Sequence, residues 1–135
     1  MRWLCLHGQG SSAEIFERQL GKYQIHYSEL HDDAHIFTAP LRSLLPHTWQ
    51  FDFVDSSHDC SAAEELELVY PGPYHCFFPR YTSEAMEEAV QYVQEVVDED
   101  GPYDCVIGFS QVRQLWNSCR LNSGPQKNLI IGINV

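Results

Sequence analysis

Three things are scarce in this 135-residue sequence, and each scarcity excludes a class of protein. Eight Lys and Arg stand against 19 Asp and Glu, and the formal charge of −11 would repel nucleic acid and anionic membrane surfaces. No apolar run approaches the roughly 20 residues that span a bilayer. The five cysteines include no C-x-x-C pair, which fits neither a disulfide framework nor a structural zinc site. We therefore expect a soluble, cytoplasmic protein with no nucleic-acid or membrane partner.

The composition that remains is that of a globular protein. Apolar residues make up 44% and charged residues 20% of the chain, which is enough for one domain with a core of its own. The segment "HDDAH" places His31 and His35 at helical i, i+4 spacing beside two aspartates, a spacing that could seat a metal ion. Short acidic segments of this kind are usually solvated loops. We expect no metal and no cofactor.

Hydrophobic periodicity predicts a parallel α/β arrangement. Short apolar runs predict strands near 2–6, 50–54 and 103–107, and residues 83–98 show the i, i+3, i+4, i+7 pattern of an amphipathic helix. Ser11 and Glu14 have the spacing of a capping box, which predicts a further helix after the first strand. Residues 56–80 show no period and are expected to form a long loop. Strand, helix and strand at this spacing favour βαβ units around a parallel sheet.

The pentapeptide "GFSQV" at 108–112 matches four of the five positions of the nucleophile elbow G-x-S-x-G. In that motif a strained turn between a strand and a helix exposes the serine hydroxyl above the sheet, so Ser110 is the candidate nucleophile. The flanking glycines let strand and helix approach closely. Val112 stands where the second glycine belongs, and we expect a steric conflict there.

The opening "LHGQG" supplies a second component, because a glycine turn after the first strand can aim a backbone N–H group at a developing oxyanion. The natural donors are Gln9 and Gln111. An alternative is a dinucleotide site, since Gly8, Gly10 and Ala13 fit G-x-G-x-x-A. That fingerprint requires a second strand ending in an acid about twenty residues on, and no strand is evident there.

Four segments together resemble the fungal serine hydrolase (FSH) family of α/β-hydrolases: "MRWLCLHGQGSSAEIFERQL", "FDFVD", "YPGPY" and "GPYDCVIGFSQ". The resemblance covers residues 1–20 and about 40–111. It implies an esterase or thioesterase that acts on a small acyl ester or thioester, including carrier-bound chains released from polyketide synthases. It also implies that Ser110 is the nucleophile, that Gln9 and Gln111 supply the oxyanion N–H groups, and that the "YPGPY" loop lines the acyl pocket.

The sequence departs from the family in two places. Residues 21–39 read as an insertion, and the tail 112–135 is unlike the family, which leaves 1–111 as a partial α/β-hydrolase domain with only the N-terminal half of the sheet. Retained intron sequence and a frame or splice error are our interpretation of these departures. A natural truncated homologue acting as a binding protein would read the same way.

The catalytic triad is incomplete in these residues. Its chain order in this fold is Ser, then Asp or Glu, then His, and no Asp, Glu or His follows Ser110. Of the upstream histidines, we expect His7 to hold the turn after the first strand and His58 and His75 to lie on a loop surface. The 135-residue chain is therefore expected to be inactive.

Overall fold

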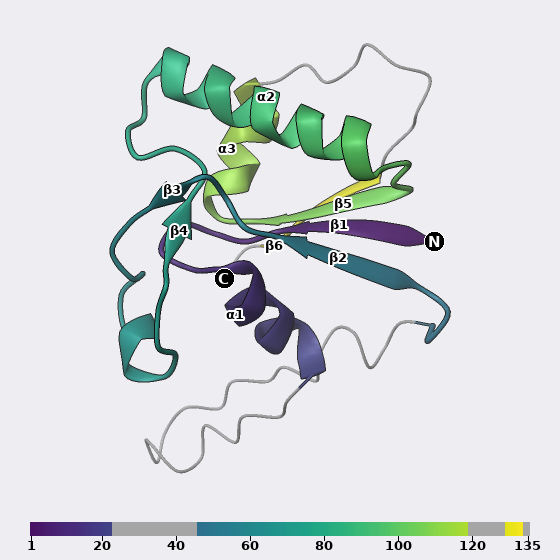
Figure 1. Ribbon diagram of the computed structural model, residues 1–135, viewed down its shortest axis with the longest axis horizontal. Helices are drawn as coiled ribbons and strands as arrows, with labels where there is room; N and C mark the ends of the chain where they lie inside the picture. The colour runs from purple at the N-terminus through teal and green to yellow at the C-terminus, as the bar shows by residue number, and fades with distance from the viewer. Residues whose placement is uncertain (23–45, 119–128, 134–135) are drawn as a thin grey trace.

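The computed structural model describes residues 1–22, 46–118 and 129–133, and its centre is a four-stranded parallel sheet. The strands are β1 (Arg2–Leu6), β2 (Gln50–Val54), β5 (Cys105–Phe109) and β6 (Leu129–Ile133), in the order β2-β1-β5-β6 (Figure 1). The parallel sheet with flanking helices expected from the sequence is confirmed. The "HDDAH" segment and nearly all of the predicted insertion at 21–39 lie outside the described residues.

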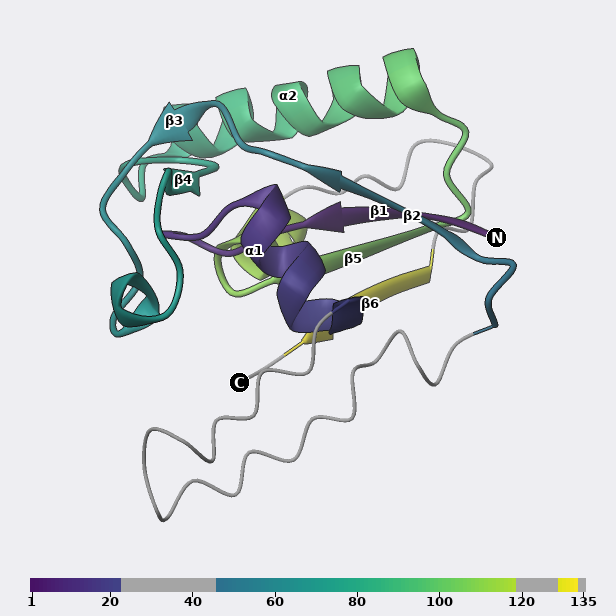
Figure 2. The same ribbon diagram turned by 60° about the horizontal axis from the view of Figure 1, so that its bottom comes forward.

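Helices cover both faces of this sheet (Figures 1 and 2). On one face lie α1 (Ala13–Glu17) and the π-helical turn η1 (Arg18–Lys22), and on the other lie α2 (Ser83–Asp100) and α3 (Gln111–Ser118). Because successive strand residues point to opposite faces, Leu4 and Leu6 pack toward α2 while Trp3 and Cys5 pack toward α1. The two apolar clusters that result are the core.

Aromatic and ionic contacts join β1 to its neighbours near the N-terminus. The Trp3 ring stacks on Trp49 and on Phe51, with centroids 5.4 and 5.9 Å apart. Arg2 pairs with the carboxylate of Asp52 at 2.7 Å, and its guanidinium lies 4.7 Å from the ring centroid of Tyr103. Burial of the Trp3 and Tyr103 side chains behind these contacts secures the start of the sheet.

The helix predicted at 83–98 is confirmed as α2, which extends to Asp100. The Thr82 side chain caps it by accepting a hydrogen bond from the Ala85 N–H at 3.3 Å, and Gly101 ends it. The predicted cap of the first helix was wrong by one residue. Ser12, not Ser11, is the N-cap of α1, and its Oγ accepts from the Ile15 N–H at 3.2 Å.

The segment 56–80 holds more structure than the long loop expected. It contains a small antiparallel sheet of β3 (His58–Asp59) and β4 (His75–Cys76), with the 3-10 turn η4 (Leu66–Leu68) between them. This sheet lies beyond the carboxyl ends of the parallel strands (Figure 1). The sequence also did not predict β6. Among the described residues, no helix has the length and apolar character needed to cross a membrane.

Candidate active site

The order of the strands creates a topological switch point at the carboxyl end of the sheet, between β1 and β5. From β1 the chain moves outward to β2 and then returns to β5 on the other side of β1. β1 and β5 are neighbours in the sheet, and the loops that leave them therefore run in opposite directions, toward β2 and β6. Open parallel sheets bind ligands at such a switch point. The glycine turn after β1 and the turn around Ser110 both lie here.

The backbone at Ser110 is strained. Its φ of 51° lies in the left-handed region, which costs a non-glycine residue roughly 1–2 kcal/mol. Ser110 is exposed between the end of β5 and the first residue of α3. Strain of this kind is typical of functional sites, and the N-terminus of α3 places partial positive charge beside the hydroxyl. This is the elbow geometry that the sequence predicted.

Two glycines make the elbow sterically feasible. A Cβ atom on Gly8 would lie 2.8 Å from Phe109 Cδ1 and 3.2 Å from Ser110 Cβ, so the turn after β1 can touch Ser110 only because residue 8 has no side chain. A Cβ on Gly108 would lie 2.4 Å from Val112 Cγ1. The expected steric conflict at Val112 is thus absent. Val112 is buried in the core, and Gly108 supplies the room that its side chain occupies.

Both candidate oxyanion donors lie at this switch point, and their side chains are engaged elsewhere. Gln111 is buried, accepts from the Phe77 N–H at 3.0 Å and donates to the Phe78 carbonyl at 2.7 Å. Gln9 accepts from the Tyr81 hydroxyl at 3.1 Å. No hydrogen-bond acceptor for either main-chain N–H group occurs in the part of the chain that the structure describes. Their role as oxyanion donors stays a prediction.

The turn after β1 is held in place by the segment 56–80. Gly10, at φ 69°, donates its N–H to the His75 carbonyl at 3.0 Å and accepts from the Ala63 N–H at 2.9 Å. The His75 N–H donates to the Ser11 carbonyl at 2.7 Å. A Cβ on Gly10 would lie 2.1 Å from the Ala63 nitrogen, so only glycine fits between these contacts. The position of Gln9 thus depends on residues more than fifty positions away.

Comparison with known proteins decides the family. A family model described as serine hydrolase (FSH1) matches residues 1–112, which include the turn after β1 and the elbow at Ser110. The chain belongs to the FSH1 serine hydrolase family. The matched residues end directly after the elbow.

Proteins that are similar to this chain in sequence include fungal esterases and hydrolases. Esterase alnB of Emericella nidulans is 29% identical over 108 residues, which is 80% of this chain and 32% of that protein. Hydrolase FUB4 of Fusarium oxysporum f. sp. lycopersici is 28% identical over 117 residues, which is 82% of this chain and 35% of that protein. Esterase FPY3 of Fusarium mangiferae is 25% identical over 114 residues, which is 82% of this chain and 44% of that protein. The chain spans about a third to less than half of the length of these relatives.

Within this FSH1 site, His7 supports the turn as the sequence predicted. Its ring is fully buried, and Nε2 accepts from the Ser56 N–H at 3.1 Å. Nδ1 must then carry the proton, which it donates to the Gly8 carbonyl at 2.7 Å. Burial lowers the pKa of His7, and the nearby His75 lowers it further, against opposing contributions from the Gly8 carbonyl and Asp55. Both ring nitrogens are engaged, so His7 is not available as a base for Ser110.

The other two upstream histidines do not lie on a loop surface, which corrects the expectation from the sequence. His58 lies on β3 and is half-buried, and His75 lies on β4 with a side chain only 15% exposed. His75 Nδ1 is 3.0 Å from Asp59 Oδ1. No hydrogen-bond acceptor for the Ser110 hydroxyl occurs within residues 1–22, 46–118 and 129–133. Within the described residues, His58 and His75 therefore show no hydrogen bond through which they could activate Ser110.

The geometry does not favour a dinucleotide at the glycine turn. A pyrophosphate would need the free N–H groups at the start of α1. There the Ala13 N–H donates to the Asp55 carboxylate at 2.7 Å, and the backbone of Ala63 lies against Gly10. A carboxylate and a neighbouring backbone segment thus fill the place of the phosphates.

Proposed function

We propose that Ser110 is the nucleophile of an FSH1 hydrolase that cleaves carboxylic esters or thioesters through an acyl-serine intermediate. The observation that carries the proposal is the left-handed backbone of Ser110 at the switch point of the sheet, directly before α3. The close approach of Gly8 adds support, because it brings the turn that contains Gln9 into contact with Ser110.

In this mechanism the Ser110 Oγ attacks the acyl carbonyl carbon while a general base removes its proton. The carbonyl oxygen gains the negative charge, and the Gln9 and Gln111 N–H groups stabilise it. Collapse of the tetrahedral intermediate breaks the bond to the alcohol or thiol, which leaves with a proton. Water then releases the acid. We extend the substrate class to carrier-bound acyl thioesters, such as those of polyketide synthases, because the resemblance to the family implies it.

The 135-residue polypeptide should not turn over on its own. It has no Asp, Glu or His after Ser110, and loss of a triad member costs several orders of magnitude in rate even when the oxyanion hole is intact. We expect no hydrolysis of short p-nitrophenyl esters above a Ser110→Ala control. Clear turnover that depends on Ser110 would contradict this expectation.

The nucleophile itself is tested on a longer chain. In this longer chain, residues 1–111 are followed by a family sequence that supplies the triad Asp and His. We expect a fluorophosphonate probe to label this protein at Ser110. The same chain with Ser110→Ala should not react. If the longer wild-type chain folds and the probe does not label Ser110, the assignment is wrong.

A second candidate is a non-catalytic binding protein, and the absence of acids and histidines after Ser110 is the observation that favours it. The transcript that spans codons 105–135 separates the two. A spliced form that encodes glycine at position 112 supports the hydrolase and the gene-model interpretation of residues 112–135. Transcripts that all read through into this tail support a binding role.

A further inference from the structure

Two cysteines lie on one face of the hairpin formed by β3 and β4. His58 pairs with Cys76, and the Cys60 N–H donates to the Tyr74 carbonyl at 3.0 Å, which extends the same register. Alternate residues of a strand share a face, so Cys60 and Cys76 are diagonal neighbours on it. The side chain of Cys60 hydrogen-bonds the Cys76 thiol. The register of the hairpin therefore holds the two thiols next to each other.

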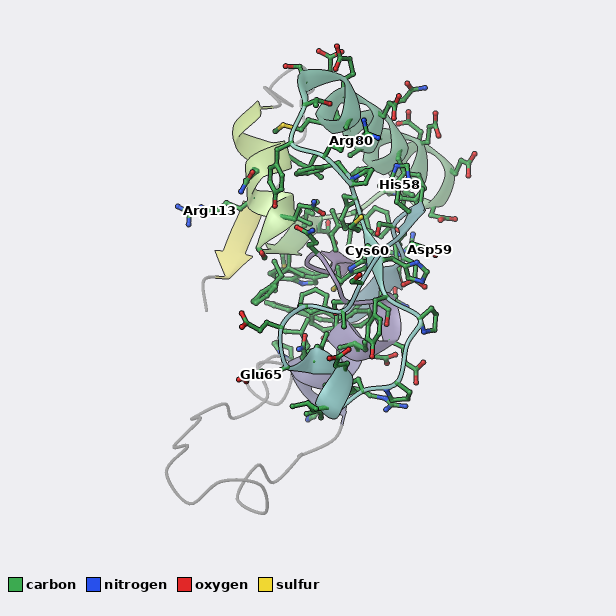
Figure 3. The ribbon with its side chains drawn as sticks, turned by 90° about the vertical axis from the view of Figure 1, so that its left-hand side faces the viewer. His58, Asp59, Cys60, Glu65, Arg80 and Arg113 are labelled. Atoms are coloured by element: carbon green, nitrogen blue, oxygen red, sulfur yellow. The ribbon has the colours of Figure 1, made fainter. Side chains whose placement is uncertain are left out.

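The two thiols differ in their access to solvent. Cys76 is buried, and burial, followed by the charge and hydrogen bond of Cys60, raises the pKa of its thiol to about 11. Cys60 is half-buried and lies beside His58 and Asp59 on the face beyond the carboxyl ends of the strands (Figure 3). An oxidant therefore reaches Cys60 first, and Cys76 is placed to resolve the product.

We propose that Cys60 and Cys76 form a reversible disulfide when the protein meets a peroxide. The Cys60 thiol gives up its proton, and the thiolate attacks one peroxide oxygen; the O–O bond breaks, the hydroxide leaves as water with that proton, and the sulfur becomes a sulfenic acid. The Cys76 sulfur then attacks the Cys60 sulfur, the S–O bond breaks, and hydroxide leaves as water with the Cys76 proton. Two thiols and one peroxide thus give one disulfide and two waters.

Formation of the disulfide should restrict the motion of the turn after β1. Diagonal neighbours in a hairpin lie about 7–8 Å apart, whereas a disulfide holds its Cα atoms within about 6.8 Å, so the two strands must approach by about 1 Å. His75, which precedes Cys76, and Ala63, three residues after Cys60, both bind Gly10. The disulfide links the two segments that position this turn and the Gln9 main chain within it.

The experiment treats the reduced 135-residue protein with hydrogen peroxide and measures its intact mass. We expect the loss of two hydrogen atoms, reversal by dithiothreitol, and a peptide map that joins Cys60 to Cys76. Cys119→Ser, which keeps both hairpin thiols, should behave like the wild type. Cys60→Ser should not lose the two hydrogens. Cys76→Ser should stop at a Cys60 sulfenic acid, which dimedone traps.

Hydrogen exchange of the peptide that spans residues 7–12 tests the consequence. We expect slower amide exchange there in the oxidised wild type than in the reduced protein, and no such difference in Cys60→Ser. A disulfide that maps to other cysteines, or oxidation of wild-type Cys60 to a sulfinic acid without a disulfide, overturns the proposal. Unchanged exchange in the oxidised protein overturns the link to the turn. None of these readouts depends on hydrolysis, so the proposal stands or fails apart from the proposed function.

Discussion

The Gln111 side chain should contribute strongly to the stability of the fold, in addition to any role that its main chain has beside Ser110. Gln111→Ala removes the acceptor for the Phe77 N–H and the donor to the Phe78 carbonyl, and all three residues are buried. An unpaired buried polar group costs about 1–3 kcal/mol, so two of them predict a loss of about 2–6 kcal/mol. A domain of this size has only about 5–15 kcal/mol of stability in total.

The assay is urea denaturation followed by far-ultraviolet circular dichroism. The matched control is Gln91→Ala on α2, which also removes a hydrogen bond from a glutamine amide, here to Glu95 Oε1 at 3.0 Å on an exposed surface. That variant should lose less than about 0.5 kcal/mol. Gln111→Met keeps most of the volume and should remain destabilised if hydrogen bonding is the cause. A Gln111→Ala variant within about 0.5 kcal/mol of the Gln91→Ala control would refute the reasoning.

Three further predictions concern residues at the carboxyl ends of β1 and β5. His7 has a lowered pKa in the folded state, so the unfolded chain takes up its proton first and stability should fall as pH decreases below 6.5, by at most about 1.4 kcal/mol per pH unit, until the folded pKa is reached. Urea titrations between pH 7 and 5 should show a smaller fall in His7→Gln, and an equal fall would contradict the assignment. Gly108→Ala should cost about 1–3 kcal/mol through contact with Val112, and a double-mutant cycle with Val112→Ala should recover part of that loss; strict additivity would exclude this contact as the cause. Ser110→Gly should raise stability by about 0.5–1 kcal/mol in thermal denaturation, because relief of the left-handed backbone outweighs the greater chain entropy of glycine, and a destabilised variant would show that Ser110 is not strained.

Elements with a strong local signal were predicted from the sequence. The apolar period of α2 and the short apolar runs of β1 and β2 gave their positions directly, and Gly108 with Ser110 marked the elbow. The strand β5 begins at Cys105, two residues later than predicted, because Tyr103 packs under Arg2 and is buried without belonging to the strand. Burial alone does not separate a strand from the segment that leads into it.

Features that depend on distant partners could not be predicted. The strands β3 and β4 are two residues each and show no period, and their pairing spans the loop between them. The strand β6 is identified by its pairing with β5. The Gln111 side chain binds main-chain groups 33 and 34 residues away. Every residue has these main-chain groups, so the sequence does not indicate which of them a side chain will bind. The same holds for the contacts of Gly10.

The stack of Trp3 on Trp49 has an optical consequence. The two indole rings are 5.4 Å apart and inclined by 26°, close enough for their electronic transitions to couple. The circular dichroism of such a pair depends on the mutual orientation of the rings, which β1 and the turn that leads into β2 fix. Because Trp3 lies near the start of β1, away from the end that leads to the glycine turn, this signal reports whether the two strands stay paired. Fraying of β2 should abolish it, while a change confined to the turn around Ser110 should leave it intact.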